Sequence, residues 1–299
     1  MVQFQKISTI VQEAAAILKR AEVSDATTDA RLLISHAVSL SREDLLRDPI
    51  TLVDGKLENK ISEIIARRAK REPVSRIIGK REFRSLSFEI GPSTLDPRFD
   101  SETLVEMAID YSASFSNSIK ILDIGTGTGC ILLSILKENK SAFGIGADVV
   151  PEALKIAKRN ASKLGLARQA CFVGMIWAEG FSGQFDLIVS NPPYIPTSEI
   201  STLSPEVACY DPYIALNGGR DGLSSYRKLA QFVPRLLSSR GVFSVEIGFG
   251  QKNSVEKLFL EGGFSLINLR KDFAGKVRCL AFQKKPTLEK KIKKRLEST

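Results

Sequence analysis

"ILDIGTGTGC" at residues 121–130 carries the strongest structural signal in this chain. Its apolar first half has the pattern of a buried strand, and the run "CILLSILKE" that follows has the apolar content of a buried helix. Between the two, Gly125, Gly127 and Gly129 allow a tight turn and leave backbone N–H groups exposed near the start of the helix. This order of elements predicts a ligand-binding turn in an open α/β sheet.

The chain on both sides of this turn alternates between short apolar runs and helical segments. The apolar runs are "AFGIGAD", "FDLIVS" and "GVFSVEIG", and they are separated by patterns such as "PEALKIAKRNASKLG" and "SSYRKLAQFVPRLLSS". Alternation of this kind is typical of a mostly parallel sheet with crossover helices. We therefore predict a Rossmann-like α/β domain over residues 96–284.

The N-terminal part has a different pattern. Apolar residues recur at helical spacing between residues 7 and 71, where Thr28 is the expected N-cap of a second helix and Pro73 stops a third. The alternating stretch "REFRSLSFEIG" then predicts a β-hairpin. We expect a small all-helical unit over residues 1–75, joined to the α/β domain by a hairpin over residues 76–95.

Composition excludes several classes of function. No apolar run approaches the length of a membrane span, and the first ten residues lack the apolar core of a signal peptide. His36 is the only histidine, and Cys130, Cys171, Cys209 and Cys279 form no C-x-x-C pair, so we expect no metal site, no disulfide and no histidine-based catalysis. These features predict a cytoplasmic protein with reduced thiols.

Positive charge is concentrated at the C-terminus. "KKPTLEKKIKKRLEST" has seven Lys or Arg against two Glu, so it carries five of the nine net positive charges. We interpret residues 285–299 as a disordered, solvated tail, and a contact between this tail and RNA stays open.

The glycine loop and the next strand together predict an adenosyl ligand. Asp148 ends that strand nineteen residues after Gly129, close to the offset at which an acidic side chain binds a ribose. The G-x-G-x-G spacing differs from the G-x-G-x-x-G of dinucleotide sites, and Asp123 would repel a pyrophosphate but suits a cationic amino acid end. The loop therefore resembles the first motif of Rossmann-like methyltransferases, and this resemblance implies S-adenosyl-L-methionine as the cofactor.

"SNPPYIP" at residues 190–196 follows a predicted buried strand and cannot continue it, because Pro192 and Pro193 lack a backbone N–H. The Asn191 side-chain carbonyl and the Pro192 backbone carbonyl would offer two acceptors to a planar NH2 group, on which Tyr194 could lie flat. This pattern predicts methyl transfer to an amino nitrogen, and it leaves open glutamine amides and the amino groups of adenine or cytosine.

These motifs, together with "REFRSLSFEIGPSTLDPRFDSETLVE", "ALNGGRDGLSSYRKL" and "KDFAGKVR", resemble the PrmC/HemK-like family of peptide chain release factor N5-glutamine methyltransferases as far as about residue 283. The resemblance implies methyl transfer from S-adenosyl-L-methionine to the glutamine amide of the Gly-Gly-Gln motif in class I release factors, leaving S-adenosyl-L-homocysteine.

The resemblance also implies roles for particular residues. It assigns the methionine part of the cofactor to the loop Gly125, Thr126, Gly127, Thr128 and Gly129, the ribose to Asp148, and the glutamine site to Asn191, Pro192, Pro193 and Tyr194, with Asn191 also near the cofactor. Trp177 best matches the aromatic residue beside adenine, although the acidic residue that usually precedes it is missing. Arg98 and Glu102 match the family in "LDPRFDSE".

Three alternatives remain. A nucleic-acid amino-methyltransferase acting on adenine N6 would use the same N-P-P-Y site, but the modest charge of the body argues against it. The glycine spacing disfavours a nicotinamide oxidoreductase, and the intact N-P-P-Y disfavours a non-catalytic release-factor binder. Our hypothesis is that the N-terminal helices dock the release factor. The oligomeric state stays open, with a monomer favoured.

Overall fold

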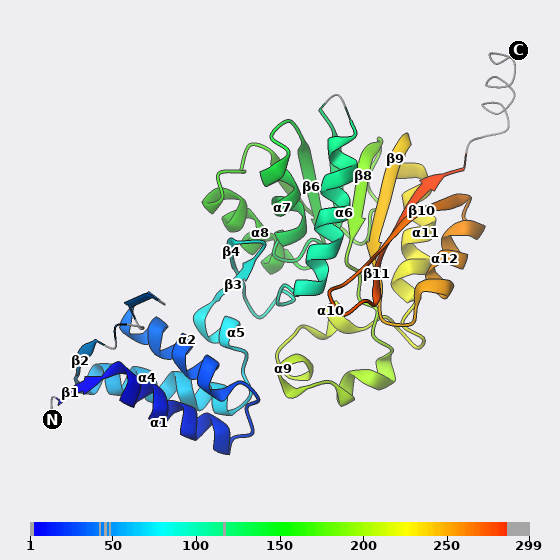
Figure 1. The fold of residues 1–299 in the computed structure, drawn as a ribbon. Coiled ribbons are helices and arrows are strands. Elements are labelled where there is room, and N and C mark those ends of the chain that lie inside the picture. Colours follow the sequence, from blue (N-terminus) through cyan, green and yellow to red (C-terminus); the bar gives the residue numbers. More distant parts are fainter. Residues whose placement is uncertain (1–2, 42, 45–46, 48, 116–117, 286–299) are drawn as a thin grey trace, which may run out of the picture. The chain divides into compact units, whose positions relative to one another are not determined.

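The computed structural model describes residues 3–41, 43–44, 47, 49–115 and 118–285 (Figure 1). They form two compact units, Met1–Lys80 with Leu203–Tyr210, and Arg81–Thr202 with Asp211–Thr299, each as far as it is described. The expected disordered tail lies outside the described residues except for Lys285. Within the described part of the chain, no helix is both long and apolar enough to cross a membrane.

The first unit is built from amphipathic helices around one apolar core. Its elements are β1 (Gln3–Lys6), α1 (Ile7–Arg20), α2 (Ala26–Val38), β2 (Ile50–Val53), α4 (Gly55–Ala69), α5 (Val74–Ile78) and α9 (Pro205–Ala208). Leu18, Leu33 and Ile65 are fully or almost fully buried in this core.

Two details of this unit differ from the sequence-based expectation. Helix α2 begins at Ala26 after Asp25, so Thr28 lies inside the helix and is not its N-cap. The unit is also not entirely helical, because β1 and β2 pair antiparallel. Each of these strands has four residues, too few for a clear alternating pattern.

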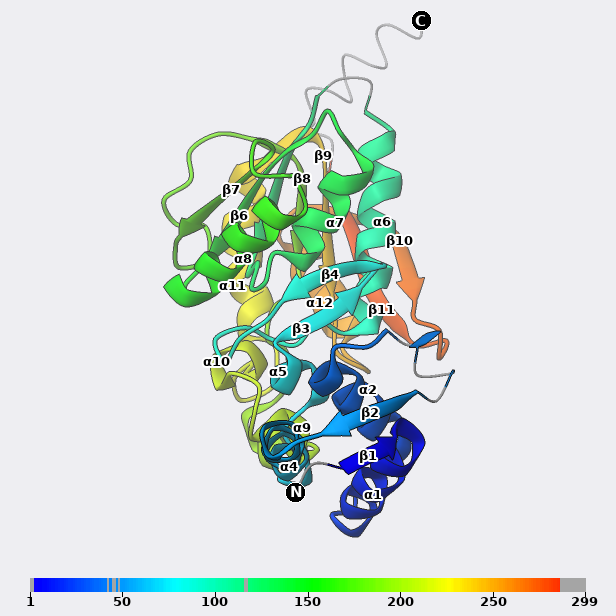
Figure 2. The same ribbon diagram turned by 90° about the vertical axis from the view of Figure 1, so that its left-hand side faces the viewer.

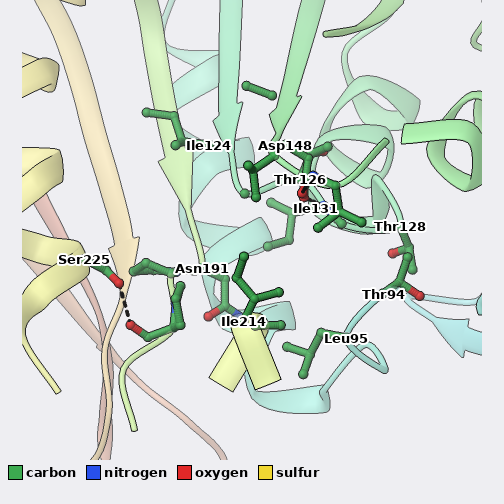
Figure 3. A pocket seen from close by; sticks show the side chains of 18 of the residues that line it. Thr94, Leu95, Ile124, Thr126, Thr128, Ile131, Asp148, Asn191, Ile214 and Ser225 are labelled. Atoms are coloured by element: carbon green, nitrogen blue, oxygen red, sulfur yellow. Dashed lines mark hydrogen bonds between the residues drawn. The ribbon is translucent and has the colours of Figure 1, made fainter. Parts of the chain in front are cut away.

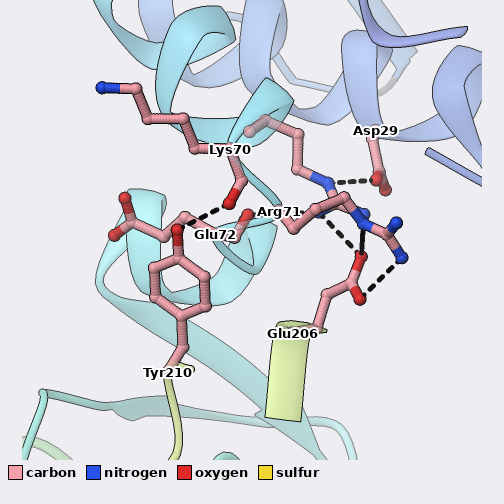
Figure 4. A network of polar contacts seen from close by, with 7 residues as sticks. Asp29, Lys70, Arg71, Glu72, Glu206 and Tyr210 are labelled. Carbon is pink, nitrogen blue, oxygen red and sulfur yellow. Dashed lines mark hydrogen bonds and ion pairs between the residues drawn. The ribbon is translucent and has the colours of Figure 1, made fainter. Parts of the chain in front are cut away.

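Residues 203–210 join the helical unit although they lie in the α/β part of the sequence. Glu206 of α9 accepts hydrogen bonds from Arg71 at 2.6 and 2.9 Å and from Arg68 at 3.1 Å, and Arg68 also bonds Asp29 at 2.7 Å (Figure 4). The Tyr210 hydroxyl donates to the Lys70 carbonyl at 2.7 Å. The domain ranges expected from the sequence assigned this segment to the α/β domain, but ion pairs hold it on the helices.

The second unit contains a seven-stranded sheet in the order β10-β11-β9-β8-β5-β6-β7 (Figures 1 and 2). The five strands from β9 to β7 are parallel, and β11 and β10 are added antiparallel. The strands are β5 (Lys120–Ile124), β6 (Phe143–Asp148), β7 (Ala170–Gly174), β8 (Phe185–Ser190), β9 (Leu237–Glu246), β10 (Phe264–Lys271) and β11 (Val277–Lys284).

Helices cover both faces of this sheet. Along β5, Ile121 packs in the core formed with α6 (Glu102–Ala113), α7 (Cys130–Glu138) and α8 (Pro151–Lys163), whereas its neighbour Leu122 packs in the core formed with α11 (Ser224–Leu236) and α12 (Lys252–Glu261). Alternate residues therefore enter opposite cores, which explains the continuous apolar runs of these strands. The predicted α/β class is confirmed.

A hairpin of β3 (Lys80–Phe83) and β4 (Leu86–Glu89) follows the helical unit in the chain. Phe83 and Phe88 are buried in the first core of the sheet unit. The side chain of the fully buried Asn160 in α8 bonds both backbone groups of Glu89 and donates to the Thr128 carbonyl at 2.9 Å. The hairpin is thereby connected to the glycine loop, the first element of the site.

Candidate cofactor and substrate site

A cavity of about 500 Å³ lies where β5, β6 and β8 end (Figure 3). This is the edge at which open parallel sheets bind ligands, and the volume suits a small-molecule site. Of the residues expected in the site, the cavity is lined by Gly125, Thr126, Gly127, Thr128, Asp148, Trp177, Asn191, Pro192 and Pro193.

The glycine loop has the conformation that its spacing predicts. Gly125, Gly127 and Gly129 have φ angles of 80°, 54° and 78°, a region that favours glycine. Gly125 and Thr126 both donate to the Ala147 carbonyl, at 2.9 and 3.0 Å, which ties the loop to β6. Gly129 does not line the cavity, and a Cβ on it would lie 3.1 Å from Leu133, so the absence of a side chain lets α7 pack closely here.

Asp148 ends β6 and holds the loop through its carboxylate. Its Oδ2 accepts from the Gly127 amide at 2.8 Å and its Oδ1 from the Val150 amide at 3.0 Å. Each carboxylate oxygen can accept more than one hydrogen bond, so both can still serve a ligand in the cavity. Asp148 thus orders the loop while it faces the cavity.

Asp123 has a different place from the one expected. Its side chain is completely buried, does not line the cavity, and accepts from the Thr126 hydroxyl at 2.6 Å. Burial, helped by the negative charge of Asp148, raises the pKa of Asp123 to about 7, although the hydrogen bond from Thr126 acts in the lowering direction. The expectation that Asp123 faces the cationic end of a ligand is therefore wrong, because its side chain bonds the underside of the loop.

Two acceptors of the N-P-P-Y stretch remain free among the described residues. The Asn191 amide nitrogen donates to the Ser101 hydroxyl at 2.9 Å, whereas no described group donates to the Asn191 Oδ1 or to the Pro192 carbonyl. The next carbonyl, of Pro193, accepts from the Ser225 hydroxyl at 2.8 Å (Figure 3). The hydrogen bond from Ser225 to Pro193 thus holds the turn, while the oxygens of Asn191 and Pro192 stay free to accept from a ligand.

Tyr194 does not line the cavity. Its ring packs against the core between the sheet and α11, its hydroxyl donates to the Glu246 Oε1 at 3.4 Å, and its carbonyl accepts from Gln251 at 2.9 Å. Burial raises the pKa of the Tyr194 hydroxyl above its ordinary value. The partly buried ring of Tyr194 therefore contacts the core, and its expected place over a substrate amide stays a prediction.

Trp177 lines the cavity from the segment that follows β7. Its φ angle is 56°, an uncommon value for a bulky residue, and its side chain is partly buried against the core that contains α11. The indole therefore presents part of its surface to the cavity, although no acidic residue precedes it.

Ser101 is the site residue that motif reasoning missed. It lies at the end of η1 (Phe99–Ser101), in "LDPRFDSE", and contacts Asn191 ninety positions later in the chain. Arg98, from the same stretch, lines the cavity and pairs with the buried Asp211. The Glu102 carboxylate accepts from the Arg84 amide at 3.1 Å. The quoted motif was the only sequence signal for this contact.

Taken together, the partly antiparallel seven-stranded sheet, the glycine loop and the N-P-P-Y turn define a Rossmann-like methyltransferase. A model described as a methyltransferase domain matches residues 115–258, and one described as the PrmC N-terminal domain matches residues 9–79. The fold is also similar to that of a methyltransferase from Pyrococcus furiosus, with a TM-score of 0.50, 19% identity, and coverage of 75% of this chain and 98% of that one.

Proteins that are similar in sequence identify the family to which this methyltransferase belongs. The chain is 45% identical to a release factor glutamine methyltransferase of Rhodospirillum rubrum, over 92% of this chain and 84% of that protein. It is 43% identical to one of Agrobacterium fabrum, over 93% and 98% of the two chains. The chain belongs to the release factor glutamine methyltransferase family.

Proposed function

We propose that this protein transfers a methyl group from S-adenosyl-L-methionine to the side-chain amide nitrogen of the Gly-Gly-Gln glutamine in class I release factors. The observation that carries the proposal is the pair of free acceptors, Asn191 Oδ1 and the Pro192 carbonyl, in a cavity that also contains the glycine loop. The names of the similar proteins state glutamine of release factor as what is methylated, and we extend this substrate to the present chain.

The residues present fit the cofactor. Gly125 and Gly127 expose backbone at the cavity, and their positive φ angles let a ligand approach closely. Asp148 offers acceptors for ribose hydroxyls, and Trp177 offers an apolar face for adenine. Bound there, S-adenosyl-L-methionine supplies an electrophilic methyl group on a sulfonium.

The chain's own contribution is to hold and polarise the amide. An amide NH2 has two hydrogens, and the Asn191 and Pro192 oxygens can accept both. Acceptance raises the electron density on a nitrogen whose lone pair is otherwise delocalised, and it stabilises the positive charge that develops as the nitrogen is methylated. Positioning supplies a further part of the rate.

No base is required before methyl transfer. The amide proton is far too weakly acidic for a carboxylate to remove, whereas the methylated nitrogen loses its proton readily to water. Asp123 and Glu246 have raised pKa values but do not line the cavity. The proposed site therefore acts through its hydrogen-bond acceptors, the oxygens of Asn191 and Pro192, and through the positioning of the substrate amide.

We further propose that the helical unit docks the release factor. One glutamine between two glycines offers few contacts, so selection of a single protein needs a second surface. Because Leu203–Tyr210 packs on these helices, the test variant should lack residues 1–80 and replace residues 203–210 by a glycine-serine linker. Cofactor binding should persist and methylation of whole release factor should fall steeply, while a short Gly-Gly-Gln peptide should react as before. Undiminished methylation of whole release factor would contradict the docking role.

The central test is a transfer assay with tritiated S-adenosyl-L-methionine. Its substrates are release factor, release factor with the glutamine changed to alanine, transfer RNA and duplex DNA. Label in intact release factor alone supports the proposal, and label in either nucleic acid supports the adenine N6 alternative. The expected cytoplasmic location, the monomeric state and a tail contact with RNA stay predictions.

A further inference from the structure

The motif "ALNGGRDGLSSYRKL", residues 215–229, lies beside the chain that leaves the N-P-P-Y turn. The Ile195 amide donates to the Leu216 carbonyl at 3.0 Å, and the Gly218 amide donates to the Ile195 carbonyl at 2.8 Å. These two backbone hydrogen bonds pair the motif with the residue that directly follows the turn. The motif is therefore in a position to influence how the turn is held.

Two glycines of the motif allow a close approach to the turn. A Cβ on Gly218 would lie 2.7 Å from the Cα and the carbonyl carbon of Tyr194, well below the ~3.5–4.0 Å of ordinary carbon contacts. A Cβ on Gly222 would collide with the Tyr194 carbonyl oxygen, and Gly222 also has a φ angle of 73°, which favours glycine. A side chain at either position would displace the backbone of Tyr194, so the motif is shaped to lie directly against the turn.

The side chain of Gln251 connects the motif to the turn. Gln251 is the N-cap residue of α12, a position where short side chains such as Ser and Asp are preferred, and its own side chain makes no cap hydrogen bond to the described helix. Its Nε2 instead donates to the Tyr194 carbonyl at 2.9 Å and to the Gly222 carbonyl at 3.3 Å. Helix capping therefore does not explain a glutamine here, whereas the contact with the turn does.

The neighbours of Gln251 admit one orientation of its amide. Its Oε1 accepts from the Gly248 amide at 2.9 Å, and the Tyr226 hydroxyl can donate to the same oxygen at 3.3 Å. Because backbone carbonyls only accept and backbone amides only donate, the NH2 must face the two carbonyls and the oxygen must face Gly248. Both hydrogens and the oxygen are in use, so rotation of this side chain would break several hydrogen bonds at once. Gln251 thus holds the Tyr194 carbonyl in a fixed place.

Ser225, which belongs to the motif, holds the preceding carbonyl in the same way. Ser225 is 2% exposed, and its hydroxyl donates to the Pro193 carbonyl at 2.8 Å (Figure 3). Two successive carbonyls of the turn, those of Pro193 and Tyr194, are therefore bound by side chains from outside it. Because Pro192 and Pro193 have fixed φ angles, a hold on these carbonyls also restricts the direction of the Pro192 carbonyl.

We propose that Ser225 and Gln251 form a turn clamp, a pair of positioning residues that keep the Asn191 and Pro192 oxygens where the substrate NH2 can donate to both. The inference rests on the proposed function, because the place of these oxygens affects the rate only if they accept from the substrate amide. Each clamp residue acts through the backbone of the turn. Misplacement of a reacting group by about 1 Å can lower a rate about a hundredfold, so even a small loosening of the turn should slow methyl transfer.

The experiment measures the turnover number kcat and KM of the full chain with release factor and tritiated S-adenosyl-L-methionine. Gln251→Met keeps the length of the side chain but removes its donors and its acceptor. It should lower kcat about ten- to a hundredfold, with unchanged KM for the cofactor and unchanged cofactor Kd in calorimetry. Gln169→Met is the matched control, because the half-buried Gln169 also donates to two backbone carbonyls, but to those of Lys140 and Ala142, which lie outside the turn.

Two further variants separate the parts of the clamp. Ser225→Ala should lower kcat about tenfold, the scale of one net hydrogen bond. Its matched control is Ser112→Ala, because Ser112 is also 2% exposed and also donates to a backbone carbonyl at 2.8 Å, that of Ile109. Gln251→Glu keeps an oxygen for the Gly248 amide but turns a second oxygen toward two carbonyls, so it should be at least as slow as Gln251→Met.

Unchanged kcat in Gln251→Met or in Ser225→Ala, or a loss of kcat that the matched control shares, would overturn the clamp. Thermal unfolding checks that each variant is folded, and if Gln251→Met does not fold, Ser225→Ala decides together with its control. An inactive wild-type chain would instead contradict the proposed function, so the two failures are distinguishable.

Discussion

Replacing Asp148 by alanine should weaken the binding of S-adenosyl-L-methionine by about 1.5–3 kcal/mol, or roughly 10- to 150-fold in Kd. The magnitude is that of hydrogen bonds between ribose hydroxyls and a charged acceptor. The same substitution removes the acceptor of the Gly127 and Val150 amides, which lie at 2.8 and 3.0 Å in the wild type. The glycine loop should therefore also lose order, which places the expected effect toward the upper end of the range.

Isothermal titration calorimetry measures this affinity directly. Asp148→Asn keeps one oxygen acceptor and should lie between wild type and alanine. Glu152→Ala is the matched control, because Glu152 is an exposed acid in the first turn of α8 whose charge change is the same. If Asp148→Ala is folded and binds the cofactor as tightly as wild type does, Asp148 is not a ligand residue and the reasoning fails.

Three further predictions concern other parts of the chain. Asn191→Ala should lower kcat on the order of 10²–10³-fold in the tritium transfer assay, and near-normal turnover would contradict the acceptor mechanism. Trp177→Ala should weaken cofactor binding in calorimetry by about 1 kcal/mol, with Trp177→Phe restoring part of it; a loss of thermal stability without a loss of affinity would make Trp177 a core residue only. Glu206→Ala should increase hydrogen exchange at residues 203–210, because Arg68 and Arg71 lose their shared acceptor, and unchanged protection would refute this role of the ion pairs.

The ion pairs of Glu206 also predict the pH dependence of this contact. Although burial opposes it, the hydrogen bonds to Arg71 and Arg68 lower the pKa of Glu206 in the folded protein. The stabilisation is therefore complete above the pKa of Glu206 in the unfolded chain and is lost as pH falls through the lower, folded-state value. Hydrogen exchange at residues 203–210, compared between wild type and Glu206→Gln across the acidic range, checks this sign.

Features with local causes could be read from the residues. The spacing of the glycines predicted a tight turn, and Gly125 and Gly127 do take φ angles that other residues avoid. Pro192 and Pro193 lack a backbone N–H, which predicted the end of β8. The continuous apolar runs of the strands predicted a sheet that is covered on both faces. Asp148 could be placed because the offset from loop to acid is a property of one β-α-β unit. In each case the physical cause operates within a few residues or one supersecondary unit.

Features that depend on distant partners could not be read in this way. Asp123 bonds Thr126 only three positions away, but whether its side chain faces a ligand depends on its complete burial in the folded unit. The Tyr194 hydroxyl contacts Glu246, which lies 52 positions later in the chain. Asn191 meets Ser101 across ninety residues, and no single sequence distinguishes that pair from many others. Such contacts arise only when the sheet brings separate segments to one edge, so the pairing of Asn191 with Ser101 is a property of tertiary packing.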